Sequence, residues 1–347
     1  MAYTDIDDPT IYFNTVLYTG NGSTQSITGV GFQPDWNWIK HRNGTSWHTL
    51  TDSVRGITKN LFSNETNAEV TNAARIISFD TDGLTVGNDV NNSGNTYASW
   101  NWKAGGTASS NTDGSITSSV SANQDAGFSI VSWTSLASGS NYTVGHGLGS
   151  TPAMIILKGR HESNSWLVYH HKNTSSPETD YLELNSTVAT ADYPVWNDTA
   201  PTSSVFTCGT WSGFDAGGTM IAYCFAEKQG YSKFGSYTGN GSTDGTFVYT
   251  GFKPAWVMIK CTSTTESWDI KDNKRNPYNT CDNGLRANQN SADDINTTYH
   301  MIDYLSNGFK LRGANQNLVN GSGQSYIYMC FAENPLVSSA GVPCTAR

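Results

Sequence analysis

Residues 18–40 read YTGNGSTQSITGVGFQPDWNWIK, and residues 237–260 read YTGNGSTDGTFVYTGFKPAWVMIK. In both segments an Asn-Gly turn leads to a Gly-Phe-x-Pro step and then to an almost wholly apolar run that ends in lysine. Asn-Gly is favoured in tight hairpin turns, and proline is tolerated where a strand opens. The apolar runs predict strands that are covered on both faces.

A third segment, WTSLASGSNYTVGHGLGSTPAMIILK at 133–158, follows the same pattern more loosely. In each segment a proline precedes the final lysine by six residues, and these prolines recur at intervals of about a hundred residues. The segments ASWNWKAGG (98–106), IAYCFAEKQG (221–230) and IYMCFAENPL (327–336) also align. That alignment puts Trp102, Phe225 and Phe331 at one position, so the chain is predicted to contain three copies of one unit. The proline and lysine pairs are Pro34 with Lys40, Pro152 with Lys158, and Pro254 with Lys260.

Short runs rich in Val, Ile, Thr and aromatic residues alternate with Gly, Asn, Asp and Ser clusters, which is typical of β-sandwiches. We expect an all-β fold of three tandem β-sandwich units of about 100 residues, an ordinary size for such a domain. Residues 52–77 are compatible with either a short helix or a long loop. The expected organisation is a first unit with an N-terminal arm (1–104), a flexible Gly/Ser/Thr-rich linker (105–127), a second unit (128–230), a third unit (231–336) and a C-terminal tail (337–347).

Composition excludes several classes of partner. The formal net charge is −9 and there is no basic block, so we expect no binding to nucleic acid. No apolar run approaches the roughly 20 residues needed to cross a bilayer, and the first residues do not resemble a signal peptide, so we expect no membrane insertion. The 6 cysteines include no CxxC pair, which argues against structural zinc and predicts mostly free, buried thiols.

The titratable residues do not form a recognisable catalytic or metal-binding motif. The histidines lack metal-ligand spacing, and His146 in VGHGLG is expected to bind the backbone of a turn. Asp80 and Asp82 in FDTDG predict a hairpin turn rather than a calcium loop. Glu227 and Glu333 occupy equivalent FAE positions, and a residue repeated in this way is more plausibly structural than catalytic. We therefore expect no metal, no cofactor and no enzymatic activity, although sequence alone does not reveal carboxylates paired in space.

Three tryptophans follow the three lysines in small polar surroundings: Trp47, Trp166 and Trp268. Tryptophan can stack on a sugar ring or anchor an interface. One interpretation makes these residues candidate platforms for glycans. The other interpretation, which the repetition favours, is that each caps the core of its own sandwich.

The segments YTGNGSTQSITGVGFQPDWNWIK, DSVRG, FDTDGLTVG and YASWNWKAGGT resemble structural proteins of marine tailed bacteriophages. These are described as tail-fibre-like or virion structural proteins of cyanophages and pelagiphages. The likeness extends over nearly the whole chain. It implies a jelly-roll sandwich of the lectin-like kind (concanavalin or SPRY type) and a place in the virion, assembled in the host cytoplasm and exposed after lysis.

The residues and the resemblance together predict a non-enzymatic virion structural protein, such as a fibre, a tail appendage or a head decoration. Its expected partners are other virion proteins, further copies of the chain in a homo-oligomer (a trimer is favoured) and host-surface glycans. Two alternatives remain open at this point. One is a purely architectural capsid or tail component, and the other is a glycan depolymerase with two acidic groups facing each other across a groove.

Overall fold

The computed structural model describes residues 4–345, and residues 1–3 and 346–347 of the expected N-terminal arm and C-terminal tail lie outside this range. The protein is all-β, with antiparallel sheets of the sandwich type. The helical elements within 4–345 are the short 3-10 turns η1 (Pro9–Ile11) and η2 (Asn88–Val90). In the described chain, no helix has the length and apolar character that crossing a membrane would require.

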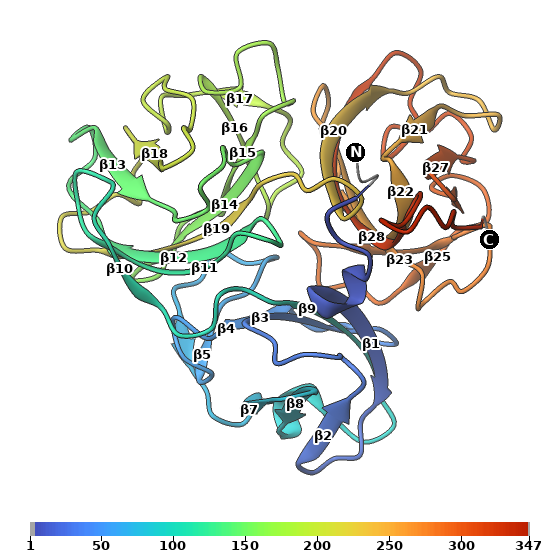
Figure 1. Ribbon diagram of the computed structural model, residues 1–347, viewed down its shortest axis with the longest axis horizontal. Coiled ribbons are helices and arrows are strands. Elements are labelled where there is room, and N and C mark those ends of the chain that lie inside the picture. Colours follow the sequence, from blue (N-terminus) through green and yellow to red (C-terminus); the bar gives the residue numbers. More distant parts are fainter. Residues whose placement is uncertain (1–3, 346–347) are drawn as a thin grey trace.

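The described strands form three lobes around a common centre (Figure 1). Lobe 1 spans residues 4–104, lobe 2 residues 105–230 and lobe 3 residues 231–335. Each lobe has a large sheet that faces the centre of the molecule and a small sheet packed on its outer side. Lobe 1 contains β1 (Phe13–Thr19), β2 (Gln25–Thr28), β3 (Trp36–His41), β4 (Thr49–Asp52), β5 (Lys59–Asn60), β6 (Val70–Thr71), β7 (Ile76–Asp80), β8 (Gly83–Val86) and β9 (Thr96–Trp102).

Lobes 2 and 3 follow the same plan. Lobe 2 contains β10 (Ser109–Asn111), β11 (Ser118–Asn123), β12 (Phe128–Thr134), β13 (Tyr142–Gly145), β14 (Met154–Gly159), β15 (Leu167–His170), β16 (Asp180–Glu183), β17 (Ala191–Asp192), β18 (Val205–Cys208) and β19 (Thr219–Phe225). Lobe 3 contains β20 (Ser232–Thr238), β21 (Phe247–Tyr249), β22 (Phe252–Cys261), β23 (Trp268–Asp272), β24 (Asn283–Arg286), β25 (Asp294–Ile295), β26 (Ile302–Leu305), β27 (Gly308–Leu311) and β28 (Ser325–Pro335).

The large sheets share one order of strands. The orders are β1-β9-β3-β4 in lobe 1, β12-β19-β14-β15 within the sheet of lobe 2, and β20-β28-β22-β23 within that of lobe 3. The register agrees with the sequence alignment, because Trp102, Phe225 and Phe331 each pair with an early residue of the central strand β3, β14 or β22. The exact division of the chain into three domains stays a prediction, and the lobes serve below as descriptive units.

The central strands are apolar nearly throughout because both of their faces are covered. Side chains alternate across a strand, so on β3 Trp36 and Trp38 point into a central core, whereas Ile39 points into the core between the two sheets of lobe 1. The strands β14 and β22 alternate in the same way. The prediction of strands covered on both faces is therefore confirmed.

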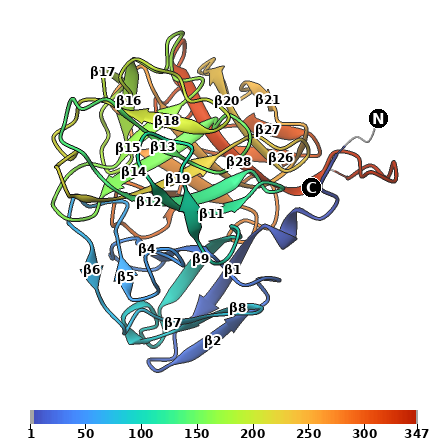
Figure 2. The same ribbon diagram turned by 60° about the vertical axis from the view of Figure 1, so that its left-hand side comes forward.

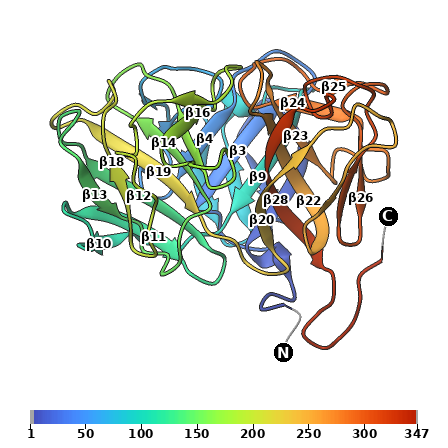
Figure 3. The ribbon, with the colours of Figure 1, turned by 90° about the horizontal axis from the view of Figure 1, so that it is seen from above.

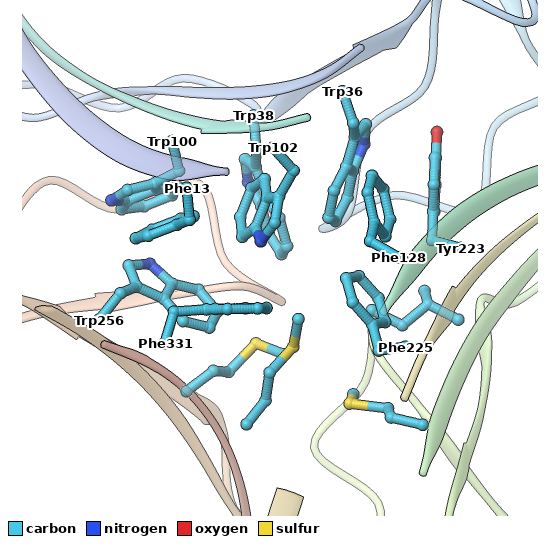
Figure 4. Close-up of a cluster of buried hydrophobic side chains, with 14 of the residues drawn as sticks. Phe13, Trp36, Trp38, Trp100, Trp102, Phe128, Tyr223, Phe225, Trp256 and Phe331 are labelled. Atoms are coloured by element: carbon cyan, nitrogen blue, oxygen red, sulfur yellow. The ribbon is translucent and has the colours of Figure 1, made fainter. Parts of the chain in front are cut away.

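The central core joins all three lobes through aromatic rings (Figure 4). The ring of Trp36 from lobe 1 stacks on that of Tyr223 from lobe 2, with centroids 4.3 Å apart. Phe13 of lobe 1 stacks on Phe331 of lobe 3 at 5.0 Å. Because such rings bury large apolar areas, the surface that each large sheet turns inward is covered mainly by the other lobes.

The expectation of a flexible linker is wrong, and of the two alternatives for residues 52–77 the helix is not found. The segment 105–127, expected as a flexible linker, contains β10 and β11, which extend the large sheet of lobe 2 by pairing onto β12. Its small polar residues are suited to the edge of a sheet, where one face meets water. The segment 52–77 contains no helix, and its described residues form turns and the short pair β5–β6.

Both ends of the described chain emerge on the same side of the molecule (Figures 2 and 3). There the backbone N–H of Ser339 donates to Asp7 Oδ1 at 2.6 Å, and Thr4 Oγ1 donates to the carbonyl of Gln229 at 3.0 Å. The strand β14 starts near this side, since Met154 pairs with Phe225 just before Gln229. Its six residues rise about 20 Å, so the loop that follows β14 lies at the opposite end.

Candidate functional site

A lysine ends the inward face of each central strand and reaches across to the neighbouring lobe. Each of these lysines has a completely buried side chain. Its Nζ donates to a backbone carbonyl of the next lobe and to acceptors in its own loop. A buried ammonium needs such partners because its desolvation is expensive. The contacts between lobes are Lys40 to Asn290 O at 3.0 Å, Lys158 to Thr66 O at 3.1 Å, and Lys260 to Thr187 O at 2.9 Å.

These contacts define three seams within the described molecule: lobe 1 with lobe 3, lobe 2 with lobe 1, and lobe 3 with lobe 2. Each seam also has two backbone hydrogen bonds at equivalent positions, so the three lobes close into a cycle. The first set is Ser46 N to Asn290 O, Asn164 N to Thr66 O, and Glu266 N to Thr187 O; the second set is Asp293 N to Arg42 O, Glu69 N to Arg160 O, and Thr190 N to Thr262 O.

The seam between lobes 1 and 2 contains a buried ionic cluster. Asp52 Oδ2 accepts from Arg55 Nε at 2.5 Å and from the Tyr223 hydroxyl at 2.7 Å. Glu69 bridges Arg55, at 3.1 Å, and Arg160 of lobe 2, at 2.8 Å. Burial alone would raise the pKa of Glu69, but its hydrogen bonds and ion pairs with Arg160 and Arg55 outweigh burial, and its pKa is lowered.

A second cluster of this kind lies between lobes 1 and 3, and the remaining seam has no such cluster. In lobe 3 the pair Asp272–Arg275 is equivalent to the pair Asp52–Arg55. Trp100 Nε1 of lobe 1 donates to Asp272, and it thereby takes the role that the Tyr223 hydroxyl has toward Asp52. At the seam of lobes 2 and 3 the same positions hold uncharged groups. These groups are His170, Asn173, Thr190 and Thr262, of which Thr190 Oγ1 donates to Asn173 Oδ1 at 2.6 Å.

The expectation that the three tryptophans form exposed glycan platforms is wrong for two of them. Trp166 is 0 % exposed and Trp268 is 1 % exposed, so neither ring can meet a sugar. Their indole N–H groups donate across seams, from Trp166 to Phe62 O at 2.9 Å and from Trp268 to Glu183 O at 2.8 Å. Trp47 is 41 % exposed and packs on the ring of Phe62.

Trp47 is also not the counterpart of the other two tryptophans. Trp166 and Trp268 follow their lysines by eight residues, and His48 holds that position in lobe 1. The structure agrees, because the backbone N–H groups of His48 and Trp166 both donate to the asparagine that follows β5 or β16. Trp47 therefore corresponds to Ser165 in lobe 2. The one-residue difference in spacing was visible in the sequence.

A pocket of about 480 Å³ opens beside Ser165 in lobe 2. Tyr181, Tyr193 and Trp211 are the aromatic residues of its lining, and Glu183 is the acidic one. Sequence analysis missed these residues because they lie on β16 and on loops that are far apart along the chain. The remaining lining residues are Thr66 of lobe 1, Ser163, Asn164, Ser165 and Ser212.

The structure also brings together His161, Glu162 and Asp215, whose ligand-type atoms lie within 4.8 Å of one another. His161 Nε2 is 3.3 Å from Asp215 Oδ2 and 3.9 Å from Glu162 Oε1. Imidazole and carboxylate groups suit a divalent cation. Surface ion pairing between the three side chains equally accounts for their grouping.

Other predicted residues occupy structural positions. His146 Nε2 binds the Thr202 carbonyl at 3.2 Å and its Nδ1 accepts from Leu148 N, so the predicted binding of the turn backbone is confirmed. Asp82 accepts from the backbone of Gly29 and Gly31 beside the β7–β8 hairpin. Glu227 pairs with Lys233 and His171.

The carboxylate of Glu333 pairs with Lys253 at 3.3 Å. The cysteines within residues 4–345 form no disulfide, and all of them are buried except the half-buried Cys344, as expected.

A comparison with curated proteins found no match to this chain. A family model described as a domain of unknown function, DUF7483, matches residues 8–335. The matched range begins just before η1 and ends with β28, so one model runs through all three lobes. The chain belongs to the DUF7483 family.

Proposed function

We propose that the protein is a non-enzymatic structural component of a tailed-bacteriophage particle, exposed on a fibre, a tail appendage or the head, where it meets host-surface glycans. The resemblance of its repeated segments to virion proteins motivates the proposal. Other virion proteins, and further copies of this chain in a trimer, are its proposed partners.

The observation that carries the proposal is the closed cycle of seams. A buried lysine and two backbone hydrogen bonds hold each pair of lobes, and one aromatic core fills the centre. Interfaces that are this apolar, and that are crossed by buried hydrogen bonds, do not allow the lobes to move independently. A rigid block that exposes loops from three sandwiches is suited to building and displaying, because it keeps its surface loops in fixed relative positions.

The places of the two chain ends and of the pocket support an exposed position on a particle. Both ends of the described chain lie on one side (Figure 3), and the pocket beside Ser165 lies at the end of β14 that is remote from them. A block anchored through its chain ends would present this pocket outward. The purely architectural alternative gives the pocket no role.

The depolymerase alternative receives less support from the pocket. Glycoside hydrolysis uses two carboxyl groups that flank the scissile bond. Among the described residues that line the pocket, Glu183 is the single carboxylate. The pocket is therefore better suited to binding a sugar than to cleaving one.

Cryo-electron microscopy of the intact particle tests the proposal. We expect density for the block at the tail periphery or on the outer head surface, with the loop after β14 facing the medium. Density lying flat within the capsid lattice or buried in the tail tube would favour the architectural alternative. Purified particles that lack the protein altogether would overturn the assignment to the virion.

A further inference from the structure

The position that forms the pocket in lobe 2 holds different side chains in each of the three lobes. In lobe 1 this position is filled, because Trp47 lies over Phe62 with ring centroids 5.0 Å apart and Arg75 lies 4.7 Å from the same ring. In lobe 2 the counterparts of Trp47 and Phe62 are Ser165 and Glu183. The loss of two aromatic side chains leaves the space that forms the pocket.

In lobe 3 charged side chains occupy the same position. The counterparts there are Ser267 and Arg286, and the guanidinium of Arg286 pairs with Asp269 at 2.5 Å and with Asp294 at 3.2 Å. Ser267 accepts from Gln289 at 3.0 Å. Among the described lobes, lobe 2 is thus the one in which this position is open and aromatic.

The aromatic wall of the pocket is held in place before any ligand arrives. Gly213 lies against the indole of Trp211, since a Cβ at Gly213 would lie 2.4 Å from that ring. Phe214 packs edge-on against Trp211 with centroids 5.2 Å apart. Tyr193 is 44 % exposed, and its backbone N–H donates to Thr179 O at 3.1 Å. Binding would therefore cost little ordering of Trp211.

The polar groups of the pocket match the hydroxyls of a sugar. The Glu183 carboxylate accepts hydrogen bonds, and the serine hydroxyls both donate and accept. Burial, followed by the charge of Glu183, raises the pKa of Tyr181, so its hydroxyl remains a donor at neutral pH. Aromatic rings cover the C–H face of a sugar ring while its hydroxyls meet such polar groups.

The charge of the pocket selects among sugars. Of the described lining residues none is cationic, and Glu183 is anionic. The nearby Lys158 is buried, and its Nζ already donates to Asn164 Oδ1 at 2.6 Å and to Thr66 O. A carboxylate or sulfate on the ligand would meet repulsion without a compensating cation.

We propose that this pocket of lobe 2 binds an uncharged hexose or N-acetylhexosamine unit of a surface glycan. The inference rests on the proposed function for the origin of the glycan, and on the pocket alone for its chemistry. The volume of about 480 Å³ falls in the ordinary range for small-ligand sites.

The test uses the full-length purified chain on an array of neutral oligosaccharides built from glucose, galactose, mannose and N-acetylhexosamines, with uronic-acid and sulfated glycans as the acidic set. We expect binding to at least one neutral glycan and to none of the acidic set. Binding to no neutral glycan, or to acidic glycans alone, overturns the inference.

Three variants locate the binding. Ser165→Trp copies the filled site of lobe 1, and Tyr193→Ala removes an exposed platform whose loss the fold tolerates. Each is expected to weaken binding of the neutral glycan at least tenfold. Trp47→Ala is the matched control at the equivalent position of lobe 1 and should bind within twofold of the parent chain. Unchanged affinity in both Ser165→Trp and Tyr193→Ala would refute the assignment to this pocket.

The glycan array tests the pocket inference and the particle reconstruction tests the proposed function, so either can be refuted without the other. A protein that is found on the particle surface but binds no neutral glycan refutes the pocket inference and leaves the proposed function standing. A protein that binds a neutral glycan through Tyr193 but is missing from the particle supports the pocket inference and refutes the proposed function.

Discussion

The Nζ atom of Lys158 in lobe 2 lies 3.1 Å from the carbonyl oxygen of Thr66 in lobe 1, and the lysine side chain is removed from solvent. Equivalent lysines make equivalent contacts at the other two described seams. The three large sheets are therefore held together at one end by lysines and along their length by aromatic rings. The consequences of this arrangement can be measured.

The first prediction concerns pH. Burial lowers the pKa of Lys158 from 10.5 to about 7. Above pH 7 the folded chain has released this proton while the unfolded chain retains it, so the free energy of unfolding rises with pH up to the unfolded pKa. The slope from one such group is at most about 1.4 kcal/mol per pH unit. Denaturant titrations between pH 6.5 and 9 measure it.

Lys158→Met should remove this contribution. The pKa values of Lys40 and Lys260 are lowered to about 8, so the difference between the variant and the parent chain is read most cleanly between pH 7 and 8. If the free energy of unfolding had the same slope against pH for both proteins in that range, the assignment of a shifted pKa to Lys158 would be contradicted.

The second prediction concerns the buried ionic cluster. Asp52→Ala should lower the free energy of unfolding by about 3–5 kcal/mol, because it leaves the buried guanidinium of Arg55 without its closest partner. Thermal and urea unfolding measure the loss.

The seam between lobes 2 and 3, which has no such cluster, supplies the control for Asp52→Ala. Replacing the cluster as a set, with Asp52→His, Arg55→Asn, Glu69→Thr and Arg160→Thr, copies that seam. We expect the set to be less destabilising than Asp52→Ala alone, because no charge is left unpaired. A larger loss for the full set would show that the two seams are not interchangeable.

The third prediction separates the tryptophans. Trp166→Ala should cost about 3–5 kcal/mol, because it empties a fully buried site and leaves the Phe62 carbonyl without its indole donor. Trp47→Ala should cost less than about 1 kcal/mol because its ring lies at the surface. Similar losses for both would mean that Trp47 has a structural role that its exposure does not suggest.

The fourth prediction concerns the independence of the lobes. A fragment of residues 1–104 would expose Trp36, Trp38, Trp100 and Trp102, which are buried only with the help of the other lobes. We expect this fragment alone to bind 1-anilinonaphthalene-8-sulfonate and to aggregate. Co-expression with a fragment of residues 105–347 should restore a soluble complex. A monomeric fragment 1–104 with a cooperative thermal transition would show that lobe 1 is an autonomous domain.

The fifth prediction concerns thiols. Burial raises the pKa of Cys224 and Cys330, so both remain protonated and unreactive. Cys344 is only half-buried. A colorimetric thiol titration should therefore count one reactive group in the native protein and six after unfolding without reductant. A lower count after unfolding would reveal a disulfide.

The fold class could be predicted from the sequence, because apolar runs such as WNWIK leave few alternatives to a strand buried on both faces. The strands at 109–111 and 118–123 could not, because their Ser and Asn residues have weak strand preference and are ordered by pairing onto β12. The joining of the lobes was also missed. It depends on contacts such as Lys40 with Asn290, which lie far apart in the chain.

The candidate pocket was beyond sequence reasoning for a related reason. Its residues Ser165, Tyr181, Tyr193 and Trp211 share no motif, and only the fold brings them together. The recurring tryptophans drew attention, but only Trp166 and Trp268 are true counterparts, and their recurrence reflects packing at the seams. The functional candidate lies where lobe 2 departs from the repeat.

The cyclic closure of the seams also limits how such a protein can enlarge over evolutionary time. In an open-ended repeat array, duplication of a unit lengthens the molecule, because each new copy meets a neighbour like the old one. Here a fourth copy would find every lysine already bound to a carbonyl and no vacant edge of the core to cover. New features must instead arise as insertions at the rim, as the paired strands β10 and β11 of lobe 2 illustrate.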